Sequence, residues 1–201
     1  MRINSPRIVR ALRVSAELDF SVEMRYPHGM PRPEDLIQKR LSWVGHSRLL
    51  FFWLDSCTLS TDGQVIATLT RPTPVSWPQI NALGYEFQFK GISFWKLVPK
   101  YTWDMISIPS GLILMTASVK GLRFKPEWEL NASSGNRYGF HFTSWDRTGA
   151  VAESAMTHEI LMKFSIMMNR GTITIQSNPP KEDILPLMLC AWCLCLEVPR
   201  S

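Results

Sequence analysis

The sequence predicts an α+β fold: a single globular domain built on a mostly antiparallel sheet with a few packed helices. Three observations predict it. Roughly ten short apolar stretches follow one another, separated by turn residues. The alternation of strand and helix that marks a parallel sheet is missing. Hydrophobic residues make up 45% of the 201-residue chain, which is enough for a packed core and excludes wholesale disorder.

The first predicted elements are a strand, a loop and a helix. Residues 18–25 alternate apolar and polar side chains, as a half-buried strand does. Residues 26–33 are rich in proline and predict a loop. Residues 34–43 carry apolar side chains at near-helical spacing after Pro33, with two acids in the first turn, and therefore predict a helix.

Strands dominate the rest of the chain. Asp62-Gly63 is a two-residue turn signal and predicts a hairpin over residues 58–70. A second hairpin is predicted around the turn at residues 146–149, and residues 159–168 are compatible with helix or strand. Other strands or apolar runs are predicted at residues 49–54, 85–89, 92–98, 103–108, 112–119, 138–145, 150–156 and 172–175.

The closing segment, Ile184–Leu196, is an uncharged run interrupted by Pro186. A bilayer-spanning helix needs about 20 apolar residues, so this run is too short to cross a membrane. It predicts a buried helix or a pair of strands. We therefore expect a soluble or peripheral protein.

Positive charge is concentrated near the N-terminus. Residues 1–48 carry nine Lys/Arg and five Asp/Glu, a balance of +4, whereas the remaining residues carry thirteen and twelve, a balance of +1. Arginines recur every third residue between positions 7 and 13, beside apolar side chains, which is the pattern of a membrane-surface helix. We predict a basic N-terminal arm (residues 1–17) ahead of the globular domain (residues 18–201). The predicted membrane-binding residues are Arg2, Arg7, Arg10 and Arg13.

Two other interpretations of this arm stay open. One is a solvated chain terminus without a binding role. The other is a mitochondrial transit peptide, which is also rich in arginine and poor in acids.

No catalytic signature is visible, so we predict a protein that is not an enzyme and has no cofactor. Cys190, Cys193 and Cys195 have a spacing that suits the start of a metal site, but a structural zinc site needs a fourth ligand. Their apolar neighbours favour packing in the core over metal binding or palmitoylation. Four cysteines without a secretory signal suggest a reducing compartment.

Two further groups of residues are candidates for a functional role. Glu127 and Glu129 flank Trp128, which on a strand places both carboxylates on one face; an exposed strand face is favoured over paired acid chemistry. Phe94-Trp95-Lys96 and residues 100–103 combine aromatic and basic side chains. Such groups stack on nucleobases or lie at a membrane interface, although core packing is the simpler interpretation.

Several segments resemble the folded core of rhabdovirus matrix proteins. Phe20–Met24, a proline-rich loop, Glu34-Asp35 and Trp43 resemble its opening strand, loop and helix. Arg48–Leu54 and Trp103–Val119 resemble its basic-apolar segment and its paired central strands. The resemblance spans residues 18–176. The Pro-Pro-x-Tyr budding motif and the lysine-rich tail of many animal-virus members are absent from this sequence.

This resemblance implies a non-enzymatic structural protein of the virion. Such a protein lies in the virion at the inner face of the envelope, or in the host cytoplasm and on endomembranes, with the nucleus as a further location. It binds anionic lipid membranes, associates with itself and contacts the viral nucleocapsid during assembly and budding. Direct binding of nucleic acid is a further expectation.

A second resemblance is to the tubby and scramblase-like barrel. Glu182–Cys190 resembles the apolar helix that closes such domains by threading a twelve-strand barrel, and Ser60–Gln64 resembles one of its hairpins. Pro186 fits the first turn of that helix. This resemblance implies binding of phosphoinositides or other anionic lipids. A helix enclosed by a barrel at residues 182–198 favours this alternative, whereas a peripheral segment favours the matrix protein.

Overall fold

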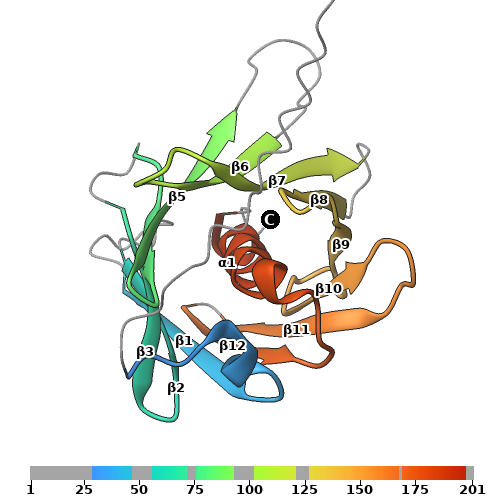
Figure 1. The fold of residues 1–201 in the computed structure, drawn as a ribbon. Helices are drawn as coiled ribbons and strands as arrows, with labels where there is room; N and C mark the ends of the chain where they lie inside the picture. The colour runs from blue at the N-terminus through green and yellow to red at the C-terminus, as the bar shows by residue number, and fades with distance from the viewer. Residues whose placement is uncertain are drawn as a thin grey trace, which may run out of the picture.

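The strands of the computed structural model form one closed antiparallel barrel around a single helix (Figure 1). The structure describes residues 29–46, 56–71, 76–92, 102–120, 127–167 and 169–197. Each of the twelve strands pairs with its neighbours in sequence, and β1 pairs with β12 to close the barrel. The strands are β1 (Arg40–His46), β2 (Ser56–Thr61), β3 (Gln64–Thr70), β4 (Gln79–Ala82), β5 (Tyr85–Ile92), β6 (Thr102–Ser107), β7 (Ile113–Lys120), β8 (Glu127–Ala132), β9 (Arg137–Phe142), β10 (Gly149–Ser154), β11 (Ile160–Met167) and β12 (Arg170–Ile175).

Alternation of side chains along the strands fills the inside of the barrel with apolar groups. On β1, Leu41 and Trp43 point inward and are buried, whereas the residues between them are exposed. The same period of two runs through β2, β8, β9 and β12. One inner face therefore continues around the whole barrel.

The helix α1 (Lys181–Glu197) lies inside this barrel, as Figure 1 shows. Every residue from Ile184 to Cys195 is buried. A helix that is apolar on all sides is stable in water only when it is enclosed, and the inner faces of the strands supply that enclosure. Within the described ranges, no helix combines the length and apolar character needed to cross a membrane.

A glycine on β12 makes room for the largest side chain of β1. Trp43 pairs with Gly171 across the β1–β12 seam. A Cβ at Gly171 would lie 2.6 Å from the indole of Trp43 and also too close to the backbone oxygen of Ser165. The missing side chain therefore lets the indole lie flat against the neighbouring strand where the barrel closes.

The predicted antiparallel sheet is confirmed, but the predicted set of packed helices is corrected. In the part of the chain that the structure describes, α1 is accompanied only by the one-turn 3-10 helix η1 (Pro33–Leu36). The fold is therefore mostly antiparallel β. The helix predicted over residues 34–43 is wrong beyond Leu36, because Gln38 adopts a positive φ of 63° and the chain continues as β1.

Most predicted strands are confirmed. Residues 58–70 form the β2–β3 hairpin, the turn at residues 146–149 joins β9 to β10, and residues 159–168, where helix and strand were both compatible, contain β11. The strands β4 and β8 were not among the predicted strands. The closing segment forms a helix, in which Pro186 lies in the second turn instead of the first, because the helix begins at Lys181. Three predictions lie outside the described residues: the strand at residues 18–25, the apolar run at 49–54 and, except for its first residue, the strand at 92–98.

Candidate functional site

The four arginines predicted to bind membranes, Arg2, Arg7, Arg10 and Arg13, lie outside the described residues. The proposed boundary of the N-terminal arm at residue 17 lies outside them too.

The strands of one half of the barrel contain no carboxylate. The six adjacent strands β11, β12, β1, β2, β3 and β4 contain three Lys/Arg and no Asp or Glu, a balance of +3. We call the outward residues of these strands the basic side. Its cations are Arg40, Lys163 and Arg170, all exposed. Its outward hydroxyl groups are those of Ser42, Ser56, Thr58, Ser60, Thr68, Thr70, Ser165, Thr172 and Thr174.

The opposite half has the reverse balance. Strands β5 to β10 contain three Lys/Arg and five Asp/Glu, a balance of −2. The cations are Lys90, Lys120 and Arg137, and the acids are Glu86, Asp104, Glu127, Glu129 and Glu153. The barrel is therefore electrostatically two-sided, and an anionic surface is attracted to one side of it.

The three cations of the basic side lie close together because the barrel closes. Arg40 on β1 and Lys163 on β11 both pair with Thr174 of β12, one on each side. Arg170 lies four residues from Thr174 on β12, about 13 Å along the strand. A patch of this size spans a few lipid headgroups or a short stretch of another polyanion.

The cations of the basic side have no acidic partner in the part of the chain that the structure describes. None of the three forms an ion pair with any described residue. Elsewhere, Lys39 pairs with Asp62 at 3.2 Å, and Lys120 with Glu129 at 3.0 Å. Lys181 pairs with Glu34 at 3.8 Å. No described carboxylate therefore neutralises these cations through a direct ion pair.

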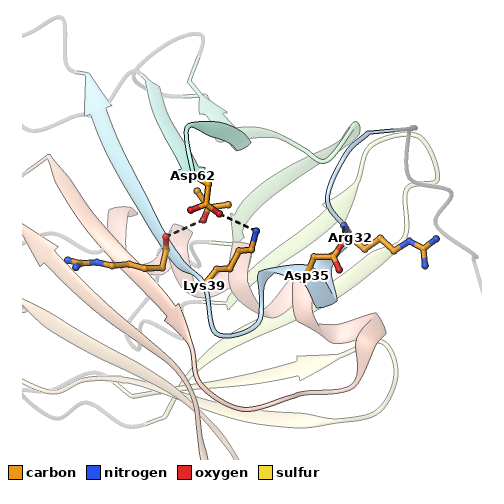
Figure 2. Close-up of polar contacts among 6 residues, drawn as sticks. Arg32, Asp35, Lys39 and Asp62 are labelled. Carbon is orange, nitrogen blue, oxygen red and sulfur yellow. Dashed lines mark hydrogen bonds and ion pairs between the residues drawn. The ribbon is translucent and has the colours of Figure 1, made fainter.

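Carboxylates at the border of the basic side are already engaged (Figure 2). Asp62, in the β2–β3 turn, binds Lys39, and Asp35 accepts a hydrogen bond from the backbone N–H of Arg32 at 2.8 Å. Arg40, just beyond Lys39, accepts a hydrogen bond from the hydroxyl of Thr61 through its backbone carbonyl. The nearest acids therefore reduce the positive potential of the basic side only in part.

A buried carboxylate ties the helix to the barrel. Asp183, in the first turn of α1, is 2% exposed. It accepts hydrogen bonds from Ser134 at 2.9 Å, Asn136 at 2.8 Å and Tyr138 at 2.5 Å. The pKa of Tyr138 is raised mainly by burial and, to a smaller extent, by its hydrogen bond to Asp183. All the donors come from the β8–β9 turn and β9, so this network is structural.

A depression of about 290 Å³, open to solvent, lies beside this network. Its lining includes Arg137, Glu159 and Asn178. Arg137 faces Glu129 at 3.9 Å, and Glu159 accepts a hydrogen bond from Ser177. Its charged groups are thus engaged in local contacts, and we assign no reaction to it.

The cysteine cluster is part of the core. Cys190, Cys193 and Cys195 lie on α1 and are at most 4% exposed, and Cys57 is fully buried on β2. Burial raises the pKa of Cys57 to about 12 and also raises the pKa of Cys190. No group of metal-ligating side chains is found among the described residues. Packing in the core, the favoured interpretation, is confirmed.

The paired acids lie on the outside of β8, as expected for an exposed strand face. Glu129 is held between Lys120 and Arg137. Glu127 is exposed and pairs in register with Lys120 and His141. The position of Glu129 is therefore explained by ion pairs with basic side chains on the two neighbouring strands.

The aromatic groups for which core packing was the simpler interpretation are only partly described. Trp103 stacks on Phe89 with ring centroids 4.9 Å apart, and the edge of Trp77 meets it at 5.9 Å. Trp103 is thus half-buried in the barrel wall. Phe94-Trp95-Lys96 and residues 100–101 lie outside the described residues.

Sequence reasoning missed Arg40, Lys163 and Arg170. Each lies at an outward position of a strand in which buried and exposed residues alternate. This alternation is the only feature of the sequence that could have indicated that the three side chains are exposed. Comparisons with protein-family models, curated proteins and solved structures find no match to this chain.

Proposed function

We propose that this protein is a non-enzymatic peripheral membrane protein that binds anionic phospholipid headgroups on the outside of a tubby/scramblase-like barrel. The observation that carries the proposal is the basic side. It has three exposed cations that form no ion pair with a described residue, on six adjacent strands that contain no carboxylate. Hydroxyl groups between these cations add donors for phosphate oxygens.

The filled interior supports binding on the outside. Apolar side chains of α1 and the strands occupy the space inside the barrel, from Ile184 to Cys195 along the helix axis. A small-molecule site is usually a cavity with a few converging polar groups. In the described part of the protein, the converging polar groups around Asp183 bind one another.

The strength of the attraction suits reversible binding. A basic residue near an anionic bilayer contributes about 1 kcal/mol. Three cations on the barrel therefore supply about 3 kcal/mol, and the arginines of the N-terminal arm would add to this. Multiple weak contacts of this kind give stable attachment only when they act together.

A matrix-type role in a virion is the second candidate. It shares the anionic membrane and adds self-association and a nucleocapsid contact. The concentration of charge in residues 1–48 supports either role. The enclosed position of α1 favours the lipid-binding barrel, which is the architecture implied by the resemblance at Glu182–Cys190.

The proposal is tested by co-sedimentation of the full chain with vesicles. We expect binding to phosphatidylserine/phosphatidylcholine vesicles, weak binding to phosphatidylcholine alone, and release by salt. The triple variant Arg40→Gln, Lys163→Gln, Arg170→Gln should lose roughly 100-fold in affinity. The matched control Lys39→Gln, Lys120→Gln, Lys181→Gln removes the same charge from ion-paired positions and should lose far less.

Equal losses of vesicle affinity in the two triple variants would refute a specific role of the basic side. The arm is tested separately by changing Arg2, Arg7, Arg10 and Arg13 to glutamine in the full chain. Weaker binding supports its role, and unchanged binding removes the arm from the mechanism. If single-stranded RNA displaces the protein from vesicles at low concentration, the basic side serves nucleic acid instead of lipid.

A further inference from the structure

Arg170 lies between two exposed apolar side chains. It pairs in register with Val44 of β1 on one side and with Met167 of β11 on the other. All three point outward, because their inward neighbours, such as Gly171, are buried. Directly opposed residues on antiparallel strands have Cβ atoms about 5 Å apart, so the three side chains form one continuous row.

The apolar members of this row are open to solvent. Val44 is 47% exposed and Met167 is 55% exposed. Single exposed apolar residues are common on protein surfaces and need no explanation. Two of them on either side of one unpaired cation form an amphipathic surface, with apolar contact area next to a positive charge.

A tryptophan extends this surface at the same end of the barrel. Trp145, in the β9–β10 turn, is 68% exposed. The backbone N–H of Ile166 donates to the carbonyl of Thr148 at 2.7 Å, which places this turn beside the end of β11. Asp146 in the same turn accepts hydrogen bonds from the N–H and hydroxyl of Thr148, so its carboxylate is engaged locally.

We propose that the row Val44, Arg170 and Met167, with Trp145 beside it, inserts into the headgroup region of an anionic bilayer. The basic side then faces the bilayer, and its end with the β11–β12 hairpin lies deepest. This orientation rests on the proposed function and adds to it an apolar contact and a direction. Arg170 would place its stem among the apolar groups and its guanidinium at the phosphates. Tryptophan prefers the same boundary between water and lipid.

The chemistry of the row favours a bilayer over a second copy of the chain. If two copies met symmetrically through this row, the two Arg170 side chains would come close together and repel each other. The six strands contain no described carboxylate that could neutralise this repulsion. An anionic headgroup layer removes this repulsion and accepts the apolar neighbours in the same contact.

Site-specific fluorescence tests the orientation in the full-length chain. Met167→Cys and Met156→Cys are each labelled with an environment-sensitive nitrobenzoxadiazole dye. Met156 is 87% exposed but lies in the β10–β11 connection, at the opposite end of the barrel, so it is the matched control. The four native thiols are buried, and the unmodified protein gives the labelling background.

We expect phosphatidylserine/phosphatidylcholine vesicles to shift the emission of the dye at 167 to the blue and to leave the dye at 156 unchanged. The double variant Val44→Ser, Met167→Ser should bind these vesicles roughly tenfold more weakly, with an unchanged response to salt. Co-sedimentation without a response at 167, or with an equal response at 156, overturns the orientation and leaves the proposed function standing. Loss of all co-sedimentation overturns both. A response at 167 that depends on protein concentration without vesicles identifies a self-association surface and overturns the proposal.

Discussion

Tyr138 donates its phenolic hydrogen to the carboxylate of Asp183 across 2.5 Å, and so joins β9 to the first turn of the enclosed helix. Ser134 and Asn136 donate to the same carboxylate from the β8–β9 turn. Asp183 lies three positions into α1, where a negative charge is also favoured by the helix dipole. One side chain thus positions the helix along the barrel axis.

Replacement of this carboxylate should destabilise the protein strongly. Asp183→Ala leaves three donors without their acceptor, one of them the buried hydroxyl of Tyr138, and we expect a loss of about 3 kcal/mol in the free energy of unfolding. Urea denaturation monitored by circular dichroism measures this loss. Glu182→Ala, the exposed neighbouring residue, should change stability by less than about 0.5 kcal/mol. Similar losses for both variants would contradict the assigned role.

Alkaline pH should weaken the same connection. The pKa of Tyr138 is raised in the folded state by burial and by Asp183, so the folded protein holds this proton more tightly than the unfolded chain. The resulting stabilisation is fully present below the unfolded pKa of about 10 and is lost as pH rises above it. We expect the free energy of unfolding to fall less steeply above about pH 10 in Tyr138→Phe than in the unmodified protein. Parallel curves for the two proteins would argue against this contribution.

Local signals allowed the hairpins to be predicted from sequence. Asp62 and Gly63 have φ values of 51° and 78°, the left-handed pair that a two-residue hairpin turn requires. Asp and Gly adopt these angles at low cost, so the turn is encoded by its own two residues. The turn between β9 and β10 is likewise encoded within a few residues, since Asp146 and Ser144 bond to Thr148.

Non-local pairing explains what could not be predicted. The spacing of the apolar residues Leu36, Leu41 and Trp43 is compatible with a helix as well as with a strand. The strand forms because β1 pairs with β12, which lies about 130 residues later in the sequence. The basic side depends on the same pairing. Arg40 and Arg170 become neighbours only when the barrel closes, so no window of the sequence contains the site.

The seam between β1 and β12 should tolerate no added side chain. Gly171→Ala would place a methyl group 2.6 Å from Trp43 and against the backbone of Ser165, neither of which can move without disturbing the core. We expect a loss of about 3 kcal/mol in unfolding free energy, measured by urea denaturation. At Gly139, an added Cβ meets the flexible side chain of Glu153 at 3.3 Å, so Gly139→Ala should cost less than about 1 kcal/mol. Equal tolerance at both glycines would show that the seam is loosely packed.

Trp192, at the centre of the helix, provides a test of how tightly the barrel encloses α1. Its side chain is fully buried, and its indole nitrogen has no hydrogen-bond partner among the described residues. Trp192→Ala should cost about 4 kcal/mol, because it leaves a large cavity in the packed interior. Trp192→Phe leaves a smaller cavity and removes the unsatisfied N–H, whose burial itself costs about 1–3 kcal/mol, so the two effects should nearly cancel. Denaturant unfolding of both variants measures the difference, and a loss for Trp192→Phe as large as for Trp192→Ala would mean that the indole nitrogen makes a stabilising contact.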